Sequence, residues 1–559
     1  MSPRRGAAIP LATLDTGPWK GVYDTADPFD AGPDRLRDLL NGWIPDAAAG
    51  SSVYARAGFA LGNNGNQIDA AATDCAVHAH TALDGSITIF VCANNKLYRV
   101  DGLRTSGGGT TTATDVTPVG VTINSAGVAS HGMASVNGLL VVNDGANRPW
   151  VGTNLTSTPI TGTSIDYDGA ASPWTAIGKP TVYLGAVFFV LNAVNGVSRR
   201  EDISWSQPGD PTTGWQQTNF DYNWTLTLHN TGPLYALSAT NLALYYFRAN
   251  SIGMIAGTDI TTLASSATND AISAEIGTKN HRSVAQFASS IFFADAQGRA
   301  QQFIPGQPIR GLWRQMRSQV DTLETVYSTS TGPTIVGAID AGYNVYLMAD
   351  LTRNPDTLYV FDAETGTYLG RWSINDTGTG GITIATVANV ADHWFRADGV
   401  IVCGEATRGD GKASYIWFLR NQRWPFTDVA GTRTWLDGSE DADTLIQPLV
   451  QVETDRLGES DAVVYALDRA TCVTGNAAPC SITVVTPTTS GTAIGSPTPS
   501  TSLDGTYRVI AGMDGVQGRG PSVTVAPAFT KANASTLGQW SMSRVSLTVR
   551  PSKAGPEEP

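Results

Sequence analysis

The feature that most constrains the fold is a meander that occurs twice in the middle of the chain, over residues 232–255 and 280–304. In the first copy, apolar runs at residues 234–237, 242–247 and 252–255 alternate with short polar turns. The second copy follows the same pattern. β-Branched and aromatic residues fit pleated, half-buried strands, and Asn, Ser, Asp and Gly supply turns. Each copy is therefore predicted to be an antiparallel meander of the size of a propeller blade.

Comparable units follow one another between residues 75 and 424. Two hairpins are predicted from turn dipeptides that favour primed turns, Asn94-Asn95 and Asn137-Gly138. The whole region holds about six or seven such units at the spacing of ~40–50 residues usual for propeller repeats. No Trp-Asp or kelch signature recurs, so the repeat is structural. A propeller leaves only short, protected strand edges; two or three stacked β-sandwiches are the alternative.

Composition agrees with an all-β class. Only 15% of the 559 residues are charged, whereas about 25% is usual, and the 59 glycines and 29 prolines suit a chain with many turns. After Trp424 the pattern changes to about six strands separated by loops rich in Gly, Ser, Thr and Pro, of which residues 486–502 form the longest. A second, β-sandwich-like domain is therefore predicted over residues 425–550, followed by a loose acidic tail at 551–559.

The segment before the propeller is predicted to be an irregular arm with the first strands, over residues 1–74. Within it, residues 33–40 are expected to form one short helix that ends at Asn41-Gly42. The arm holds several aromatic residues, which are expected to pin it against the body of the protein. The predicted organisation is thus an arm (1–74), a propeller (75–424), a C-terminal β domain (425–550) and a tail (551–559).

The chain is acidic, with a formal net charge of −13. A sequence-nonspecific DNA-binding protein would instead carry an excess of clustered Lys and Arg. No long run of one sign occurs, so the negative charge is expected to be spread over the surface. It would then serve solubility, or a surface that repels nucleic acid.

The five cysteines do not form a disulfide framework or a metal-binding pattern. Cys75, Cys92 and Cys403 are predicted to be buried thiols on apolar strands, whereas Cys472 and Cys480 could pair across a hairpin. No run reaches the ~18 apolar residues that a membrane span needs. Arg4-Arg5 is followed by too short an apolar stretch for export, so synthesis in a reducing cytoplasm is expected.

Several groups of residues are candidate sites, but none has the pattern of an active site. His78 and His80 could share one strand face as two metal ligands, but no third ligand accompanies them. The Asp166-Tyr-Asp168-Gly169 sequence resembles the start of a calcium loop without its closing acid. One further candidate is an acidic turn with Glu440, Asp441 and Asp443. Another is a possible sugar-stacking platform formed by Trp205, Trp215 and Trp224. No catalytic, cofactor-binding or metal-binding residue and no cofactor are predicted, although a pair of glycosidase carboxylates could be present among the many acids.

Several stretches together resemble the β-propeller tail proteins of short-tailed bacteriophages, the nozzle or hub family. They are residues 19–28, which begin Trp-Lys-Gly-Val-Tyr, residues 39–46, which contain Asn-Gly-Trp-Ile-Pro, the Arg-Ala-Gly-Phe run at 56–59, residues 203–215 with their Gly-Asp-Pro turn and Trp215, the meander at 232–255, and residues 276–284 and 291–298. The resemblance covers residues 15–425. The long Thr, Ser and Gly loops and the C-terminal domain depart most from the family pattern.

The resemblance implies a structural, non-enzymatic virion protein. It implies a homo-oligomeric ring, six copies in the family, that extends the channel of the portal and adaptor proteins and conducts or retains DNA during ejection. The implied partners are portal or head-to-tail adaptor proteins, tail fibres or spikes, and passing DNA that is not bound by sequence; no membrane partner is implied. The competing hypothesis is a propeller that binds or cleaves carbohydrate.

Overall fold

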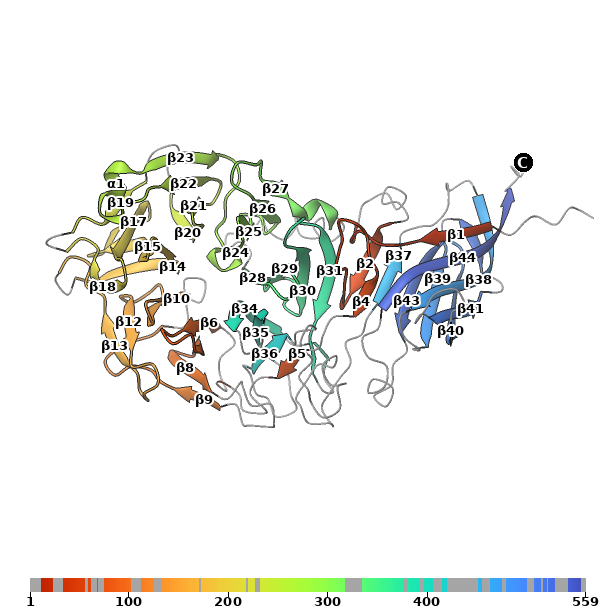
Figure 1. Ribbon diagram of the computed structural model, residues 1–559, viewed down its shortest axis with the longest axis horizontal. Helices are drawn as coiled ribbons and strands as arrows, with labels where there is room; N and C mark the ends of the chain where they lie inside the picture. Colours follow the sequence, from red (N-terminus) through yellow and green to blue (C-terminus); the bar gives the residue numbers. More distant parts are fainter. Residues whose placement is uncertain are drawn as a thin grey trace, which may run out of the picture.

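The computed structural model describes strands from residue 12 to residue 553, with gaps between the described ranges. The described residues are 12–23, 34–55, 59–61, 68, 75–101, 112–124, 132–169, 172–217, 220–226, 232–316, 334–376, 380–381, 383–392, 397–405, 415–419, 451–454, 463–474, 479–499, 507–513, 516–519, 521–527 and 541–553. In these residues the protein is almost entirely β-sheet. Figure 1 shows a ring of small sheets joined to a second β-sheet domain.

The ring is a β-propeller, which confirms the predicted fold class. Six separate small sheets form six of its seven blades. Strands β28–β31, the sixth blade in chain order, form the remaining one and also join the larger sheet of the second domain (Figure 1). The strands of the first three blades are β6 (Cys75–Thr81), β7 (Ile87–Ala93), β8 (Lys96–Asp101), β9 (Thr112–Asp115); β10 (Gly132–Val136), β11 (Leu139–Asn143), β12 (Trp150–Thr153), β13 (Thr161–Ser164); and β14 (Trp174–Tyr183), β15 (Ala186–Val194), β16 (Val197–Ser198), β17 (Asp202–Gln207), β18 (Asp210–Gly214), β19 (Asn223–Thr225).

The two central meanders form the fourth and fifth blades, as predicted. With the sixth and seventh blades, their strands are β20 (Leu234–Ala239), β21 (Leu244–Arg248), β22 (Ile252–Ala256), β23 (Thr268–Ser273); β24 (Ala285–Phe287), β25 (Ser290–Ala294), β26 (Ala300–Phe303), β27 (Arg310–Gly311); β28 (Ile335–Asp340), β29 (Val345–Asp350), β30 (Thr357–Asp362), β31 (Tyr368–Ser373); and β34 (Thr383–Asp392), β35 (Ala397–Glu405), β36 (Tyr415–Leu419). Short helices connect some of them, including α1 (Leu263–Ser266), η3 (His281–Ser283) and η4 (Leu312–Gln315). A short hairpin of β32 (Asn375–Asp376) and β33 (Gly380–Gly381) follows the sixth blade.

An N-terminal strand closes the ring. β5 (Phe59–Leu61) pairs antiparallel with β36 and so completes the last blade, and β6 then begins the first. The inner strands β34 and β6 lie in contact, as do β6 and β10. Because the two ends of the propeller sequence meet in one hydrogen-bonded sheet, closure does not depend on side-chain packing alone.

Apolar side chains from neighbouring blades form the propeller cores. Phe90 of the first blade packs with Leu140 and Trp150 of the second, and Phe247 of the fourth blade packs with Phe293 of the fifth. The predicted primed turns are present, since Asn94 and Asn95 both have positive φ, as do Asn137 and Gly138. Local turn chemistry and blade-to-blade packing thus specify the same fold.

The C-terminal domain folds as a curled sheet whose apolar faces enclose one core, in agreement with the predicted sandwich. Its strands alternate, as β39 and β43 show with a buried residue at every second position. The core includes Ile482, Val525 and Leu547. The strands are β37 (Gln451–Thr454), β38 (Val463–Thr474), β39 (Cys480–Val485), β40 (Ser490–Pro499), β41 (Tyr507–Gly512), β42 (Gln517–Arg519), β43 (Ser522–Pro527) and β44 (Ser541–Lys553).

One expected loop of this domain is a strand. Residues 486–502 were expected to form a long loop, but β40 occupies most of that range and pairs with β39 through Ser490–Gly495 and with β41 through Ser496–Pro499. Its Gly, Thr and Pro residues disfavour an isolated strand. Pairing on both sides outweighs this preference, and β40 thereby carries the chain from one half of the curled sheet to the other.

The N-terminal segment is built into the second domain. β1 (Ala12–Thr16) pairs with β44, and β3 (Gly42–Trp43) pairs with β4 (Val53–Ala55), which also pairs with β44. The helix expected over residues 33–40 is wrong: β2 (Leu36–Leu40) is a strand between β31 and β37. Leu36 and Leu39 are fully buried there, so tertiary pairing overrides the local preference for helix.

The cysteine predictions can be followed at three of the five positions. Cys92, Cys472 and Cys480 carry buried thiols rather than disulfides. A hydrogen bond with the neighbouring Cys480, followed by burial, raises the pKa of Cys472. The two side chains therefore meet in the core as thiols. Cys75 and Cys403 lie on strands β6 and β35, and their side chains are outside the described part of the chain.

Candidate functional site

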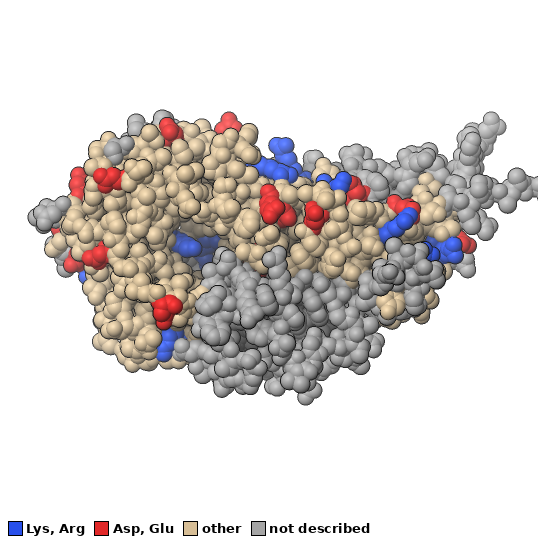
Figure 2. Space-filling view, viewed as in Figure 1, with Lys and Arg blue, Asp and Glu red and all other residues tan. Residues whose placement is uncertain are grey.

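The candidate site is the channel at the centre of the propeller. A cavity of about 490 Å³ lies there, lined by the inner strands of all seven blades. Figure 2 shows Lys and Arg side chains in this central hollow, whereas Asp and Glu lie around the rim of the ring. The cationic lining residues are Lys179 and Arg282, and among the described residues no Asp or Glu lines the cavity. In a chain of net charge −13, the channel concentrates the opposite sign.

A bulge in β14 presents Lys179 to the channel. Ile177 pairs with Val190 and Thr181 pairs with Phe188, so three residues of β14 stand opposite a single residue of β15. Such a bulge kinks a strand and re-aims its side chains. Gly178 begins the bulge with a φ of +78°, in the region that glycine adopts without strain.

The second blade makes room for this bulge. A Cβ on Gly132 of β10 would stand 2.3 Å from the Cα of Lys179. Asn143, at the end of β11, donates from Nδ2 to the carbonyl of Gly178 at 2.9 Å. The position of Lys179 is thus fixed by a close backbone approach and a side-chain hydrogen bond from the second blade.

The two cations are held in different ways. The Lys179 side chain is exposed within the channel. The surrounding protein walls partly desolvate its amine, and this desolvation lowers the pKa of the amine. Its backbone N–H donates to Nδ1 of His281 at 3.1 Å, which leaves the protonated nitrogen of that ring at Nε2 while the ring is neutral. Arg282 donates from Nη2 to the carbonyl of Ala385 in the last blade at 3.1 Å.

His78 and His80, the pair considered as metal ligands, converge on a serine. His78 Nε2 lies 2.7 Å from Ser135 Oγ, and His80 Nδ1 lies 2.9 Å from the same oxygen. Burial, followed by the charge of Lys179, lowers the pKa of His78 to about 3; burial lowers that of His80 to about 4. Both rings are therefore neutral near pH 7.

This geometry favours binding over catalysis or metal coordination. Each histidine uses one nitrogen on Ser135, and the nearby Lys179 charge disfavours a cation. A His78 with a pKa of about 3 is a weak base for activating the Ser135 hydroxyl. Within the described residues, no three His, Cys, Asp or Glu side chains are grouped as a metal site. A site with two cations and neutral donors is instead complementary to an anion.

The low pKa values of the two histidines predict acid sensitivity. Their ordinary pKa is 6.5, so below that pH the unfolded chain binds protons that the folded protein does not. Above pH 6.5 the two histidines do not lower the free energy of unfolding. Below pH 6.5 that free energy falls as the pH drops toward 4, because only the unfolded chain binds the protons. Between pH 7 and pH 5, urea unfolding should show a loss of about 1–2 kcal/mol for each histidine.

The double variant H78Q/H80Q provides the comparison for this measurement. It should lose less stability than the wild type over the same pH interval. Asp350, whose pKa burial raises to about 6, acts in the opposite direction but is common to both proteins. Equal pH dependence in the two proteins would contradict the assignment of buried, neutral histidines.

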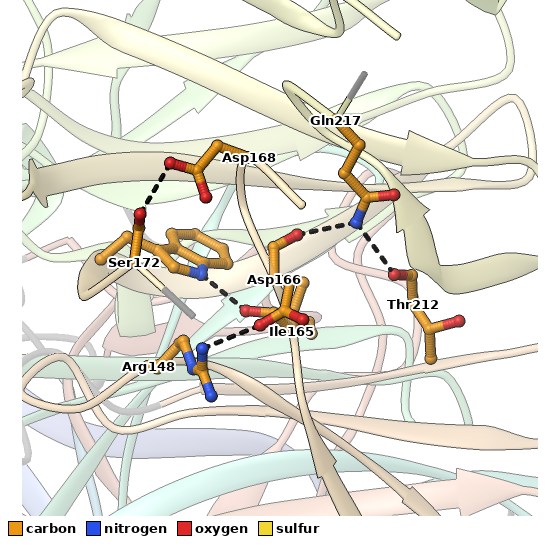
Figure 3. Close-up of polar contacts among 8 residues, drawn as sticks. Arg148, Ile165, Asp166, Asp168, Ser172, Thr212 and Gln217 are labelled. Carbon is orange, nitrogen blue, oxygen red and sulfur yellow. Dashed lines mark hydrogen bonds and ion pairs between the residues drawn. The ribbon is translucent and has the colours of Figure 1, made fainter. Parts of the chain in front are cut away.

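The candidate calcium loop is occupied by internal contacts. Asp166 forms an ion pair with Arg148 at 2.8 Å, and its backbone carbonyl accepts from Gln217. The carboxylate of Asp168 accepts from Ser172 Oγ at 2.7 Å. Figure 3 shows these carboxylates engaged with different partners. Together with Trp174, which donates to the carbonyl of Ile165, they fix the connection into β14.

The tryptophans considered as a sugar platform are mostly core residues. Trp205 and Trp215 are fully buried, and Trp224 is half-buried. Trp205 stacks on Phe188 and Tyr222. A stacking platform for sugar needs exposed ring faces, which two of the three rings lack. The acidic turn with Glu440, Asp441 and Asp443 lies outside the described residues.

The sequence interpretation missed Lys179, Arg282 and Ser135. One signal for Lys179 was available, because Gly178-Lys179-Pro180 interrupts a strand pattern, and such interruptions mark bulges. Arg282 lies in the second meander beside His281, and its direction depends on η3. Arg282 and Lys179 line the same channel only because the blades close into a ring.

Comparison with known proteins identifies no family. No family model matches the chain, and no curated protein sequence matches it. Among solved structures, the extracellular domain of the putative hybrid two component system BT4673 from B. thetaiotaomicron is 12% identical, with a TM-score of 0.38 over 64% of this chain and 39% of that one. BBS1N in complex with ARL6DN is 11% identical, with a TM-score of 0.37 over 66% of this chain and 98% of that one.

A complex of S. cerevisiae dbp5 with nup159 and gle1 contains a further match, at 9% identity and a TM-score of 0.35 over 65% of this chain and 96% of that one. These likenesses concern the fold alone, and no ligand or partner is transferred from them. Among the helices that the structure describes, none is long and apolar enough to cross a membrane.

Proposed function

We propose that this chain is a structural subunit of a bacteriophage tail, a nozzle or hub protein that forms a ring below the portal and adaptor. In this role copies of the chain, six by family resemblance, surround a lumen through which DNA leaves the particle. The subunit acts as a rigid connector and catalyses no reaction. Its partners are further copies of itself, the portal or adaptor proteins, and tail fibres or spikes.

The observation that carries the proposal is the continuous sheet between the propeller and the second domain. β2 pairs in parallel with β31 of the sixth blade and antiparallel with β37 of the second domain. A connector in a tail must transmit force without bending, and a shared hydrogen-bonded sheet resists bending better than a linker.

Side chains reinforce the same junction. Arg371 of β31 forms an ion pair with Asp38 of β2. Trp372 Nε1 donates to the carbonyl of Gly42 at 2.7 Å, and Asn41 exchanges hydrogen bonds with Ser373. The residues that resemble the nozzle family near the N-terminus therefore include those that join the two domains.

The surface charge is compatible with a DNA conduit. On the face that Figure 2 shows, Asp and Glu are spread over the ring and the junction, with small separate groups of Lys and Arg between them. Duplex DNA carries one negative charge per about 1.7 Å, so a basic lumen wall would retain it through counterion release. An acidic or neutral wall between subunits would let it pass.

Electron microscopy of the intact particle, with this subunit located by a tag or antibody, tests the proposal. The expected result is a ring of copies on the tail axis next to the adaptor. A location on the capsid shell, or in a side fibre away from the axis, would overturn it. Reproducible cleavage of a polysaccharide by the purified protein would instead favour the carbohydrate hypothesis, which the burial of Trp205 and Trp215 weakens.

A further inference from the structure

We propose that the central channel of the propeller is a binding site for a small phosphate-bearing anion, held by Lys179 and Arg282. This inference is independent of a role in a phage tail. It depends on the channel geometry, the charge of its lining and the backbone arrangement that places the lysine.

The cavity has the size of a ligand site. Its volume of about 490 Å³ lies within the ~300–1,000 Å³ typical of small-molecule pockets. A single bound water accounts for only ~30 Å³. The channel can therefore admit a molecule with several oxygens, such as a triphosphate or a phosphorylated metabolite.

The lining supplies charge of one sign. Lys179 and Arg282 carry positive charges, and no carboxylate lines the described part of the channel. Cations confined by protein walls raise the local concentration of anions. Lys179 and Arg282 line the same cavity as His78, and the Lys179 charge adds to burial in lowering the pKa of that ring.

Neutral groups complete the set of donors. The hydroxyl of Ser238 and the rings of His78 and His281 line the same cavity. The hydroxyls of Ser135 and Thr181 also line it, but Ser135 bonds the two histidines and Thr181 donates to the carbonyl of Leu237. Neutral imidazole and hydroxyl groups can donate hydrogen bonds to phosphate oxygens and carry no charge themselves. Arginine and lysine bind phosphate through charge-assisted hydrogen bonds, and arginine can do so with two parallel bonds.

The backbone around Lys179 is specialised. The fold adopts a three-residue bulge, a positive φ at Gly178 and a close approach at Gly132 to present this lysine inward. A lysine needed only for solubility could lie on any outer strand. Placing it in a confined channel lowers its pKa and so carries an energetic cost, which binding of an anion would offset.

Isothermal titration calorimetry with sodium triphosphate tests the proposal on the full-length protein. At pH 7.5 and low salt, wild-type protein should bind one triphosphate per chain in a saturable manner, and the affinity should fall as salt rises. K179M and R282Q should each bind about 10- to 100-fold more weakly, the effect expected for losing one charge-assisted hydrogen bond. K179R should retain most of the affinity.

The matched control is K96M, which removes the same charge from a blade surface. Lys96 pairs with Asp115 at 3.1 Å, is about half exposed, and does not line the channel. K96M should bind triphosphate like the wild type. Thermal unfolding should show that triphosphate raises the melting temperature of wild type and K96M but not of K179M.

Three outcomes would overturn the proposal. The first is the absence of saturable triphosphate binding by the wild type. The second is an equal loss of affinity in K179M, R282Q and K96M, which would indicate a nonspecific charge effect. The third is tighter binding of citrate than of triphosphate, which would assign the channel to carboxylates instead of phosphates.

Discussion

Replacing Gly370 with alanine should destabilise the protein by about 3 kcal/mol or more. Gly370 lies in β31, where this strand meets β2, and its φ is +116°. A Cβ at this position would stand 2.3 Å from the carbonyl oxygen of Leu39 and 2.8 Å from its Cβ. Because the obstruction includes backbone, rotation of a side chain cannot relieve it. The strand that joins the propeller to the second domain would have to shift.

Gly85→Ala is the matched control for this prediction. Gly85 also has a positive φ, +80°, but an added Cβ would meet nothing within 4 Å. The substitution should cost only about 1 kcal/mol, the penalty of the backbone conformation itself. Urea unfolding of both variants separates two costs: the steric clash with Leu39 at the junction, and the cost of a positive φ for alanine. Equal losses in the two variants would show that β2 does not pack tightly against β31.

Replacing Trp205 with alanine should cost about 3–5 kcal/mol of folding stability. The ring is fully buried, stacks on Phe188 and Tyr222, and donates from Nε1 to the carbonyl of Ile260 at 3.1 Å. Truncation would leave a large cavity between the third and fourth blades and leave that carbonyl without this donor. The urea midpoint should fall accordingly.

Trp224→Ala is the comparison, because Trp224 lies on β19 and is only half-buried. Its loss should destabilise the protein less than that of Trp205. If these rings instead formed a sugar platform, Trp205→Ala would leave stability nearly unchanged and reduce binding to a glycan. That pattern would restore the carbohydrate hypothesis.

Sequence reasoning was most successful where structure depends on near neighbours. The strands of the two central meanders and the primed turns at Asn94-Asn95 and Asn137-Gly138 are present as predicted. It failed at β2 and β40, which were expected to be a helix and a loop. Both strands are stabilised by partners distant in the chain, and their own residues have weak or opposing preferences.

The candidate site was less predictable than the fold. The sequence predicts that His78 and His80 share one strand face, and in the structure both rings contact Ser135, but only His78 lines the cavity. Their common partner, Ser135, lies 57 residues from His78. Lys179 lies in the third blade and Arg282 in η3, just before the fifth blade, and no local pattern relates their positions.

The sequence by itself determined the all-β class, the blade-sized meanders and the alternating strands of the second domain, because each follows from side-chain period and turn residues within a few positions. Only the tertiary structure decided which strands close the ring, how β2 joins the two domains, and which charges face the channel. Those features require residues far apart in the chain to meet, and the energy of such meetings depends on packing and pairing that no short stretch of sequence contains.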